Sequence, residues 1–181
     1  MNLSFRTPIG VCGVITAWNF PIAVPSWKII PALVCGNTVV FKPSDDSPHS
    51  AQIFAEILEE AGLPPGVFNV VHGRAEAGAA LVEHPDVALI GFTGSTTTGK
   101  HIASICGAMN KKCSLEMGGK NAQIVMDDAN MDLALEGVLW GAFGTTGQRC
   151  TATSRLILHE KIYDEFINRL ISKATKLKLG D

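Results

Sequence analysis

The stretch that decides the fold is Val87-Ala-Leu-Ile-Gly-Phe92, followed by Thr93-Gly94 and then by Ser95-Thr-Thr-Thr-Gly-Lys100. The first six residues form an apolar run that includes β-branched side chains, as in a strand buried on both faces. A glycine turn then leads into a longer segment, 95–109, which is predicted to be a helix. A buried strand followed directly by a helix is the repeating unit of a parallel α/β sheet.

The same alternation extends in both directions along the chain. An extended segment is predicted at 9–18, strands at 38–42, 67–71, 121–126 and 155–158, and helices at 24–35, 47–62, 76–83, 132–143 and 161–178. The Gly118-Gly119 pair interrupts the pattern, which indicates a domain boundary there. No return strand follows the last predicted helix, so we expect the second part to be incomplete.

Composition excludes several classes of protein. The 181 residues, 46% hydrophobic and 18% charged, are enough for one domain with a core and too few for two full ones. The 15 basic and 17 acidic residues give a net charge of −2 without a basic run, which argues against nucleic-acid and membrane-surface partners. No apolar stretch approaches the roughly 20 residues that span a bilayer.

Cysteine and histidine usage indicates a reduced protein without a metal site. The cysteines are Cys12, Cys35, Cys106, Cys113 and Cys150, an odd number without C-x-x-C spacing. This pattern does not suit a disulfide framework or a cysteine-rich zinc site, so a cytoplasmic location is expected. The histidines form no ligand cluster and are interpreted as surface or structural residues: His49, His72, His84, His101 and His159.

One alternative interpretation is a nucleotide triphosphatase. Gly94-Ser-Thr-Thr-Thr-Gly-Lys100 follows a strand and opens a helix, as a phosphate-cradling loop does, and Asp127 could bind magnesium. However, His101 stands where a Ser or Thr hydroxyl should coordinate that ion. The G-x-G-x-x-G dinucleotide fingerprint is absent as well. We therefore regard this as the weaker interpretation.

Five motifs, which follow one another along the chain, support a different interpretation. They are Trp18-Asn-Phe-Pro21, Phe41-Lys-Pro-Ser44, Phe92-Thr-Gly-Ser-Thr96, Glu116-Met-Gly-Gly-Lys-Asn121 and Gly147-Gln-Arg-Cys150. Together they closely resemble the aldehyde dehydrogenase superfamily over essentially all 181 residues. The resemblance covers the middle of a family member. The usual N-terminal segment, the later glutamate-and-phenylalanine motif and the strand that pairs between subunits are not part of it.

The resemblance implies a fold and an activity. Residues 1–116 would form most of a Rossmann-like, doubly wound dinucleotide-binding domain, and residues 117–181 would begin an α/β catalytic domain. The complete protein would be a homo-oligomer, dimer or tetramer, that oxidises an aldehyde to a carboxylic acid with NAD or NADP, and the wording of the motifs hints at semialdehydes. We expect the 181 residues alone to be inactive. The alternative is a non-catalytic dinucleotide-binding fragment.

Three residues carry the chemistry that the resemblance implies. Cys150 would be the nucleophile, since its thiohemiacetal can lose hydride and leave a thioester. Asn19 would donate its side-chain amide to the oxyanion, beside the backbone N–H of Cys150. Glu116 would be the general base that activates water against the thioester, which favours release of a free acid over transfer to coenzyme A.

The resemblance also assigns cofactor contacts. The Gly94-Ser95 turn would approach the pyrophosphate, while Ile15, Thr16 and Trp18 would line the cleft. Lys42 and Asp45 would hold the adenosine ribose, although many members carry a longer Glu in place of Asp45. A carboxylate there repels the 2′-phosphate of NADP, so NAD is expected to be preferred by about ten- to a hundred-fold. The ammonium group of Lys42 opposes this preference.

Overall fold

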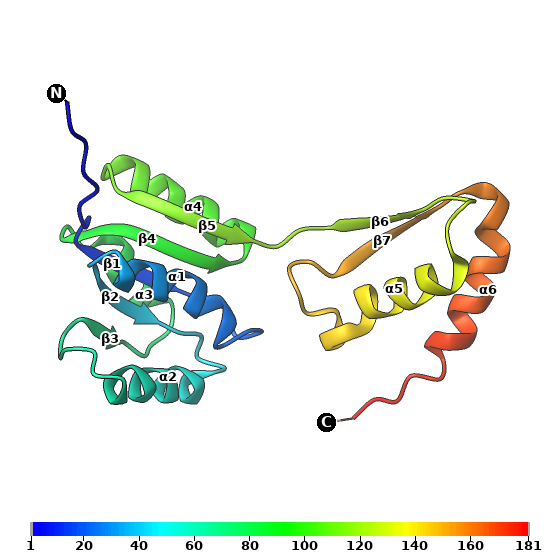
Figure 1. Ribbon diagram of the computed structural model, residues 1–181, viewed down its shortest axis with the longest axis horizontal. Helices are drawn as coiled ribbons and strands as arrows, with labels where there is room; N and C mark the ends of the chain where they lie inside the picture. Colours follow the sequence, from blue (N-terminus) through cyan, green and yellow to red (C-terminus); the bar gives the residue numbers. More distant parts are fainter. Residues whose placement is uncertain (1, 181) are drawn as a thin grey trace. The chain divides into compact units, whose positions relative to one another are not determined.

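The computed structural model describes residues 2–180 of the chain (Figure 1). The chain divides into two compact units, the first ending at Met117 and the second beginning at Gly118. Each unit has its own parallel sheet and its own buried apolar side chains. None of the helices formed by residues 2–180 is long and apolar enough to cross a membrane.

Strands and helices alternate throughout the first unit. Over residues 2–117 the order is β1 (Val11–Ile15), α1 (Ala23–Val34), β2 (Thr38–Lys42), α2 (Pro48–Glu60), β3 (Phe68–Val70), α3 (Ala75–Glu83), β4 (Val87–Gly94), α4 (Thr96–Ala108) and β5 (Lys112–Met117). These strands are all parallel and lie side by side in the order β3-β2-β1-β4-β5. The doubly wound parallel α/β sheet predicted from the sequence is confirmed.

Different helices cover the two faces of this sheet (Figure 1). On one face, Ile29 of α1 and Phe54 of α2 belong to the same core as Phe41 of β2. On the other face, Val82 of α3 and Ile102 of α4 belong to the same core as Ile90 and Phe92 of β4. Successive strand residues point to opposite faces, so strands covered on both faces must be apolar throughout. This explains the continuous apolar runs in the sequence.

The winding of the chain changes direction at β1. This strand lies between β2 and β4, and the helices that follow β1 and β4 pack on opposite faces of the sheet. In such sheets the carboxyl ends of the two central strands border a crevice that accepts ligands. The ends of β1 and β4, at Ile15 and Gly94, therefore mark where a ligand site is expected in the first unit.

The first strand is shorter than the predicted extended segment at 9–18, because β1 covers only Val11–Ile15. A side chain accounts for its late start. Asn37 Oδ1 accepts hydrogen bonds from the backbone N–H of Ile9 at 2.7 Å and of Gly10 at 3.1 Å. These two donors are therefore satisfied by a side chain rather than by a neighbouring strand.

The second unit is a two-stranded parallel sheet with helices packed on one face. Over residues 118–180 the order is β6 (Asn121–Val125), α5 (Met131–Phe143), a 3₁₀ turn (Gly144–Gly147), β7 (Thr153–Leu158), a second 3₁₀ turn (Glu160–Ile162) and α6 (Tyr163–Ala174). Leu135 of α5 and Phe166 of α6 share a core with Val125 of β6. Ile124 and Ile157, which pair across the two strands, remain more than half exposed.

The last helix differs from the prediction of one helix at 161–178. Its start is a separate 3₁₀ turn, where His159 Nδ1 accepts the N–H of Lys161 at 3.3 Å. At its other end, the Thr175 hydroxyl donates to the carbonyl oxygen of Ile171 at 2.9 Å. Side-chain hydrogen bonds of this kind compete with helix continuation, and α6 ends at Ala174.

Candidate active site

A cavity of about 340 Å³ opens between α3 and α4 in the first unit. Small residues of α3 leave the space, and apolar side chains form its walls. The small residues are Ala75, Gly78 and Ala79, and the apolar ones are Ile15, Val82, Phe92, Ile102 and Ile105. Such a slot suits a flat ring system, because apolar walls remove the ring from water without offering competing polar groups.

Three charged residues line the same cavity: Lys42, Asp45 and Arg74. Lys42 Nζ lies 3.0 Å from Asp45 Oδ1, and Arg74 Nε lies 3.6 Å from Asp45 Oδ2. The hydrogen bond from Lys42 lowers the pKa of the Asp45 carboxyl, and Arg74 adds a smaller effect in the same direction. Asp45 is therefore held as a carboxylate, beside the apolar slot.

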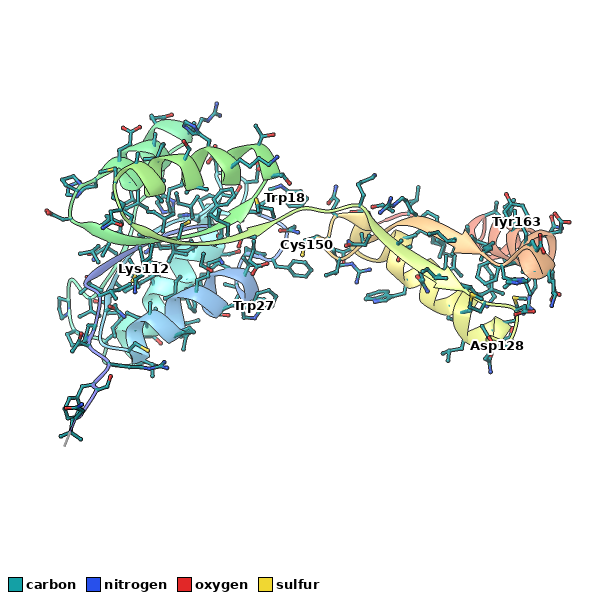
Figure 2. The ribbon with its side chains drawn as sticks, turned by 90° about the horizontal axis from the view of Figure 1, so that it is seen from above. Trp18, Trp27, Lys112, Asp128, Cys150 and Tyr163 are labelled. Atoms are coloured by element: carbon teal, nitrogen blue, oxygen red, sulfur yellow. The ribbon has the colours of Figure 1, made fainter. Side chains whose placement is uncertain are left out.

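The other predicted cofactor residues lie near the strand ends and do not line this cavity. Thr16 is buried, and its N–H donates to the carbonyl oxygen of Lys42 at 3.3 Å, which joins the ends of β1 and β2. Trp18 follows on the loop after β1 and is 44% exposed (Figure 2). Ile15, Lys42 and Asp45 are thus the predicted residues that the cavity brings together.

Gly94 and Ser95 form the junction between β4 and α4. The Ser95 hydroxyl accepts the N–H of Thr98 at 3.2 Å and so caps the helix. Only Ser95 separates the strand from the helix, so residues 96–100 are already helical. A phosphate-cradling loop needs those residues as loop. The triphosphatase interpretation therefore has no structural support.

Sequence analysis missed the contribution of α3 and α4 to the cavity. His101, interpreted as a surface or structural residue, is exposed and lines it. The one signal available was the group of small residues at 75 and 77–80 in Ala-Glu-Ala-Gly-Ala-Ala, which leaves room along one helix. Over residues 2–180, no three His, Cys, Asp or Glu side chains are placed to hold a metal ion.

A second cavity, of about 560 Å³, lies on the opposite face of the same sheet. It is lined by Trp27 and Lys28 of α1 (Trp27 is labelled in Figure 2) and by Glu116 of β5. Burial lowers the pKa of Lys28, and the charge of Glu116 partly opposes that shift. Lys28 was not foreseen from the sequence, because 88 positions separate it from Glu116. The predicted Asn19 lies on the loop before α1 and lines neither cavity.

Cys150 is exposed on the loop before β7 in the second unit (Figure 2). The side-chain amide of Asn121 donates to the carbonyl oxygen of Cys150 at 2.6 Å and to that of Ala152 at 3.1 Å. No hydrogen bond from the Cys150 backbone N–H is present within residues 2–180. The peptide around the thiol is therefore fixed through its carbonyl groups, and its N–H is available to a ligand.

Arg149 fixes the other side of the same loop. Its Nη2 donates to the carbonyl oxygen of Trp140 at 2.6 Å and to that of Gly141 at 3.3 Å. The guanidinium carbon also lies 4.9 Å from the centre of the Trp140 ring, within cation–π range. These contacts attach the residue before Cys150 to the end of α5. Neither Arg149 nor Asn121 was singled out as a site residue from the sequence.

The loop also contains strained backbone. Thr145 and Thr146 have φ values of 54° and 53°, in the left-handed region that β-branched residues avoid. Each such residue costs about 1–2 kcal/mol relative to a right-handed conformation. Strain of this kind concentrates at functional sites, where the surrounding structure enforces a particular placement of side chains.

Comparison with known proteins gives consistent matches over the whole chain. The model of the Aldehyde dehydrogenase family matches residues 1–181. The 2-hydroxymuconic semialdehyde dehydrogenase of Pseudomonas putida is 47% identical over 183 residues, covering 100% of this chain and 38% of that protein. A crystal structure of PnpE in complex with nicotinamide adenine dinucleotide has a TM-score of 0.94 at 49% identity and covers 97% of this chain and 36% of that one. The structure of an E. coli NADP dependent enzyme has a TM-score of 0.93 at 45% identity, with coverages of 97% and 37%.

The strand order β3-β2-β1-β4-β5, with helices on both faces of the sheet, defines the class of Rossmann-like α/β folds. Within that class, the chain belongs to the aldehyde dehydrogenase family. The resemblance read from the five motifs is thereby confirmed. The chain spans less than two fifths of the length of the curated relatives that it matches.

Proposed function

We propose that the complete protein oxidises an aldehyde to a carboxylic acid with a nicotinamide dinucleotide. The observation that carries the proposal is the exposed Cys150 thiol on a strained loop, braced by Asn121 and Arg149. This thiol stands in the motif that holds the nucleophile in the family. A relative is named as a semialdehyde dehydrogenase, which supports semialdehydes as substrates.

The first cavity fits the adenosine half of such a cofactor. The apolar slot would take the adenine ring, and Lys42 with Asp45 would hold the ribose hydroxyls. Gly94 and Ser95 lie at the N-terminus of α4, and the positive end of a helix dipole favours a pyrophosphate. Ile15, Thr16 and Trp18 would line the remainder of the cleft. The bound dinucleotide supplies the hydride acceptor, and the charge of Asp45 supports NAD as the preferred form.

The chemistry on the protein has two halves. In the first, the Cys150 thiolate adds to the aldehyde carbon, and the resulting oxyanion accepts hydrogen bonds from the Asn19 amide and the Cys150 N–H. Oxidation of this thiohemiacetal leaves a thioester on Cys150. In the second, Glu116 accepts a proton from water, which attacks the thioester carbon and releases the acid and the thiolate. The nearby Lys28 gives Glu116 a charged neighbour.

The proposal includes the arrangement of the whole protein. Residues 1–116 would form most of the dinucleotide-binding domain, and residues 117–181 would begin the catalytic domain. The five free cysteines support a reducing, cytoplasmic location. The family resemblance supports a homodimer or homotetramer.

A direct assay tests the function. The complete protein, incubated with NAD or NADP and a set of aldehydes that includes semialdehydes, should form reduced cofactor and carboxylic acid in equal amounts. Binding of the cofactor without turnover of any aldehyde would instead favour the second candidate, a non-catalytic dinucleotide-binding protein. That candidate is supported by the cavity, which lies wholly within the first unit.

A substitution in α3 should block nucleotide binding. A Cβ atom at Gly78 would lie 3.9 Å from its nearest neighbour, Ile15 Cδ1, so alanine fits there. Gly78→Leu places a larger side chain in the slot and should weaken binding of 5′-AMP at least about tenfold, a loss of ~1.4 kcal/mol. Calorimetric titration measures this, with Gly78→Ala as the matched control. Normal 5′-AMP binding by the Leu variant would show that the adenine ring binds elsewhere.

Asn121 should affect the rate of turnover because its amide holds Cys150 in position. Asn121→Ala removes two hydrogen bonds worth about 1 kcal/mol each, so kcat should fall by up to about thirtyfold. The KM for cofactor should not change, because the cofactor cavity lies in the other unit. Asn168→Ala on the exposed surface of α6 is the control. An unchanged kcat in Asn121→Ala would show that the amide does not position the nucleophile.

A further inference from the structure

The carboxylate of Asp45 is shared between two cations. Lys42 Nζ approaches one oxygen at 3.0 Å, and Arg74 Nε approaches the other at 3.6 Å. All three residues line the cavity between α3 and α4. The group therefore carries one net positive charge, although Asp45 alone would make this part of the cavity negative.

The backbone beside Arg74 adds to the positive potential. Arg74 immediately precedes α3, and no side chain caps the first N–H groups of that helix. Free N–H groups at a helix N-terminus favour anions, although Glu76 in the first turn partly offsets this. An anion bound close to Asp45 would thus find two side-chain cations and the start of a helix.

The two cations differ in their freedom to move. The Lys42 side chain is only 10% exposed and makes the shorter contact with Asp45, so it is fixed in place. The Arg74 side chain is 83% exposed, and exposed ion pairs at such distances contribute little to the stability of the fold. Its guanidinium can therefore leave Asp45 at small cost and present two parallel N–H donors to a phosphate.

We propose that Arg74 is a specificity-determining residue that binds the 2′-phosphate of NADP. This inference rests on the proposed binding of adenosine in the cavity. NADP differs from NAD only by that phosphate on the adenosine ribose, and Asp45 is proposed to hold this ribose. Arg74 offsets the repulsion between the phosphate and Asp45, so the preference for NAD is smaller than Asp45 alone would produce.

Two small nucleotides isolate the effect. Adenosine 2′,5′-bisphosphate carries the additional phosphate and 5′-AMP lacks it, and neither contains nicotinamide. Calorimetric titration of the complete protein with both should show that Arg74→Gln weakens binding of the bisphosphate about tenfold and changes binding of 5′-AMP less than twofold. Lys100→Gln, which removes a cation of α4 that does not line the cavity, should change neither. The difference in bisphosphate affinity between wild type and Arg74→Gln should also decrease as salt is added.

The outcomes separate this inference from the proposed function. If the complete wild-type protein binds neither nucleotide, the proposal that adenosine binds in the cavity is wrong, and the proposed role of Arg74 is wrong with it. If 5′-AMP binds and Arg74→Gln binds the bisphosphate as tightly as wild type does, the cavity stands and the role of Arg74 is refuted. Circular dichroism of each variant checks the fold, which should be unaffected because Arg74 is exposed and makes no capping hydrogen bond.

Discussion

Cys150→Ser should lower aldehyde oxidation by the complete protein on the order of a thousandfold or more. The serine hydroxyl is almost entirely protonated near neutral pH and is a much weaker nucleophile than a thiolate, so the thiohemiacetal does not form. Cofactor binding should remain, because the cavity proposed for adenosine lies in the first unit and Cys150 in the second. Rates of reduced-cofactor formation and calorimetric titration measure the two effects.

Cys113→Ser provides the matched control for this prediction. It removes another exposed thiol, on β5, that has no proposed role in the reaction. This variant should oxidise aldehyde at close to the wild-type rate. A Cys150→Ser protein that keeps a tenth or more of the wild-type activity would mean that the nucleophile is a different group.

Glu116→Gln should separate the two halves of the reaction. The variant should release one equivalent of reduced cofactor per site and then stall, since water is no longer activated against the thioester. The steady-state rate should fall about a hundred- to a thousandfold, within the range attributed to general bases. Rapid-mixing absorbance measures the initial burst, and mass spectrometry of the quenched enzyme should detect the acyl group on Cys150.

The control for Glu116→Gln is Glu60→Gln, which removes an exposed carboxylate at the end of α2. It should leave both the burst and the steady-state rate unchanged. A Glu116→Gln enzyme without a burst and without an acyl adduct would place the role of Glu116 before thioester formation. The proposed division of labour between Glu116 and Cys150 would then be wrong.

Local patterns were sufficient to predict most elements of the fold. The strand at 38–42 has the predicted bounds, and α2 begins at Pro48 within the predicted helix. These elements depend on apolar periodicity and on turn residues within a few positions. The order β3-β2-β1-β4-β5 is consistent with the predicted doubly wound sheet, but no short segment encodes it, because each parallel pairing joins distant parts of the chain.

The candidate sites depend even more on contacts between residues that are distant in the sequence. The motifs identified Cys150 as a candidate site residue. Asn121, which donates a hydrogen bond to the Cys150 carbonyl, lies 29 positions earlier and was quoted only as the end of another motif. Arg74 was not foreseen as a site residue, and its contact with Asp45 also spans 29 positions. Such pairings depend on how helices pack against strands, which residue types and short spacings do not specify. The functions of Cys150, Glu116 and Asn19 stay predictions.

Thr145 and Thr146, whose backbone is in the left-handed region, bring thermal stability and turnover into conflict. Glycine adopts positive φ without steric cost, although the greater conformational entropy that it gives the unfolded chain lowers stability by about 0.5–1 kcal/mol. Thr145→Gly or Thr146→Gly can therefore raise the melting temperature while loosening the loop that holds the thiol. Laboratory evolution under thermal selection alone should accept such changes, whereas selection that also demands turnover should reject them. The residues found at positions 145 and 146 would therefore show whether a population had been selected for stability alone or also for turnover.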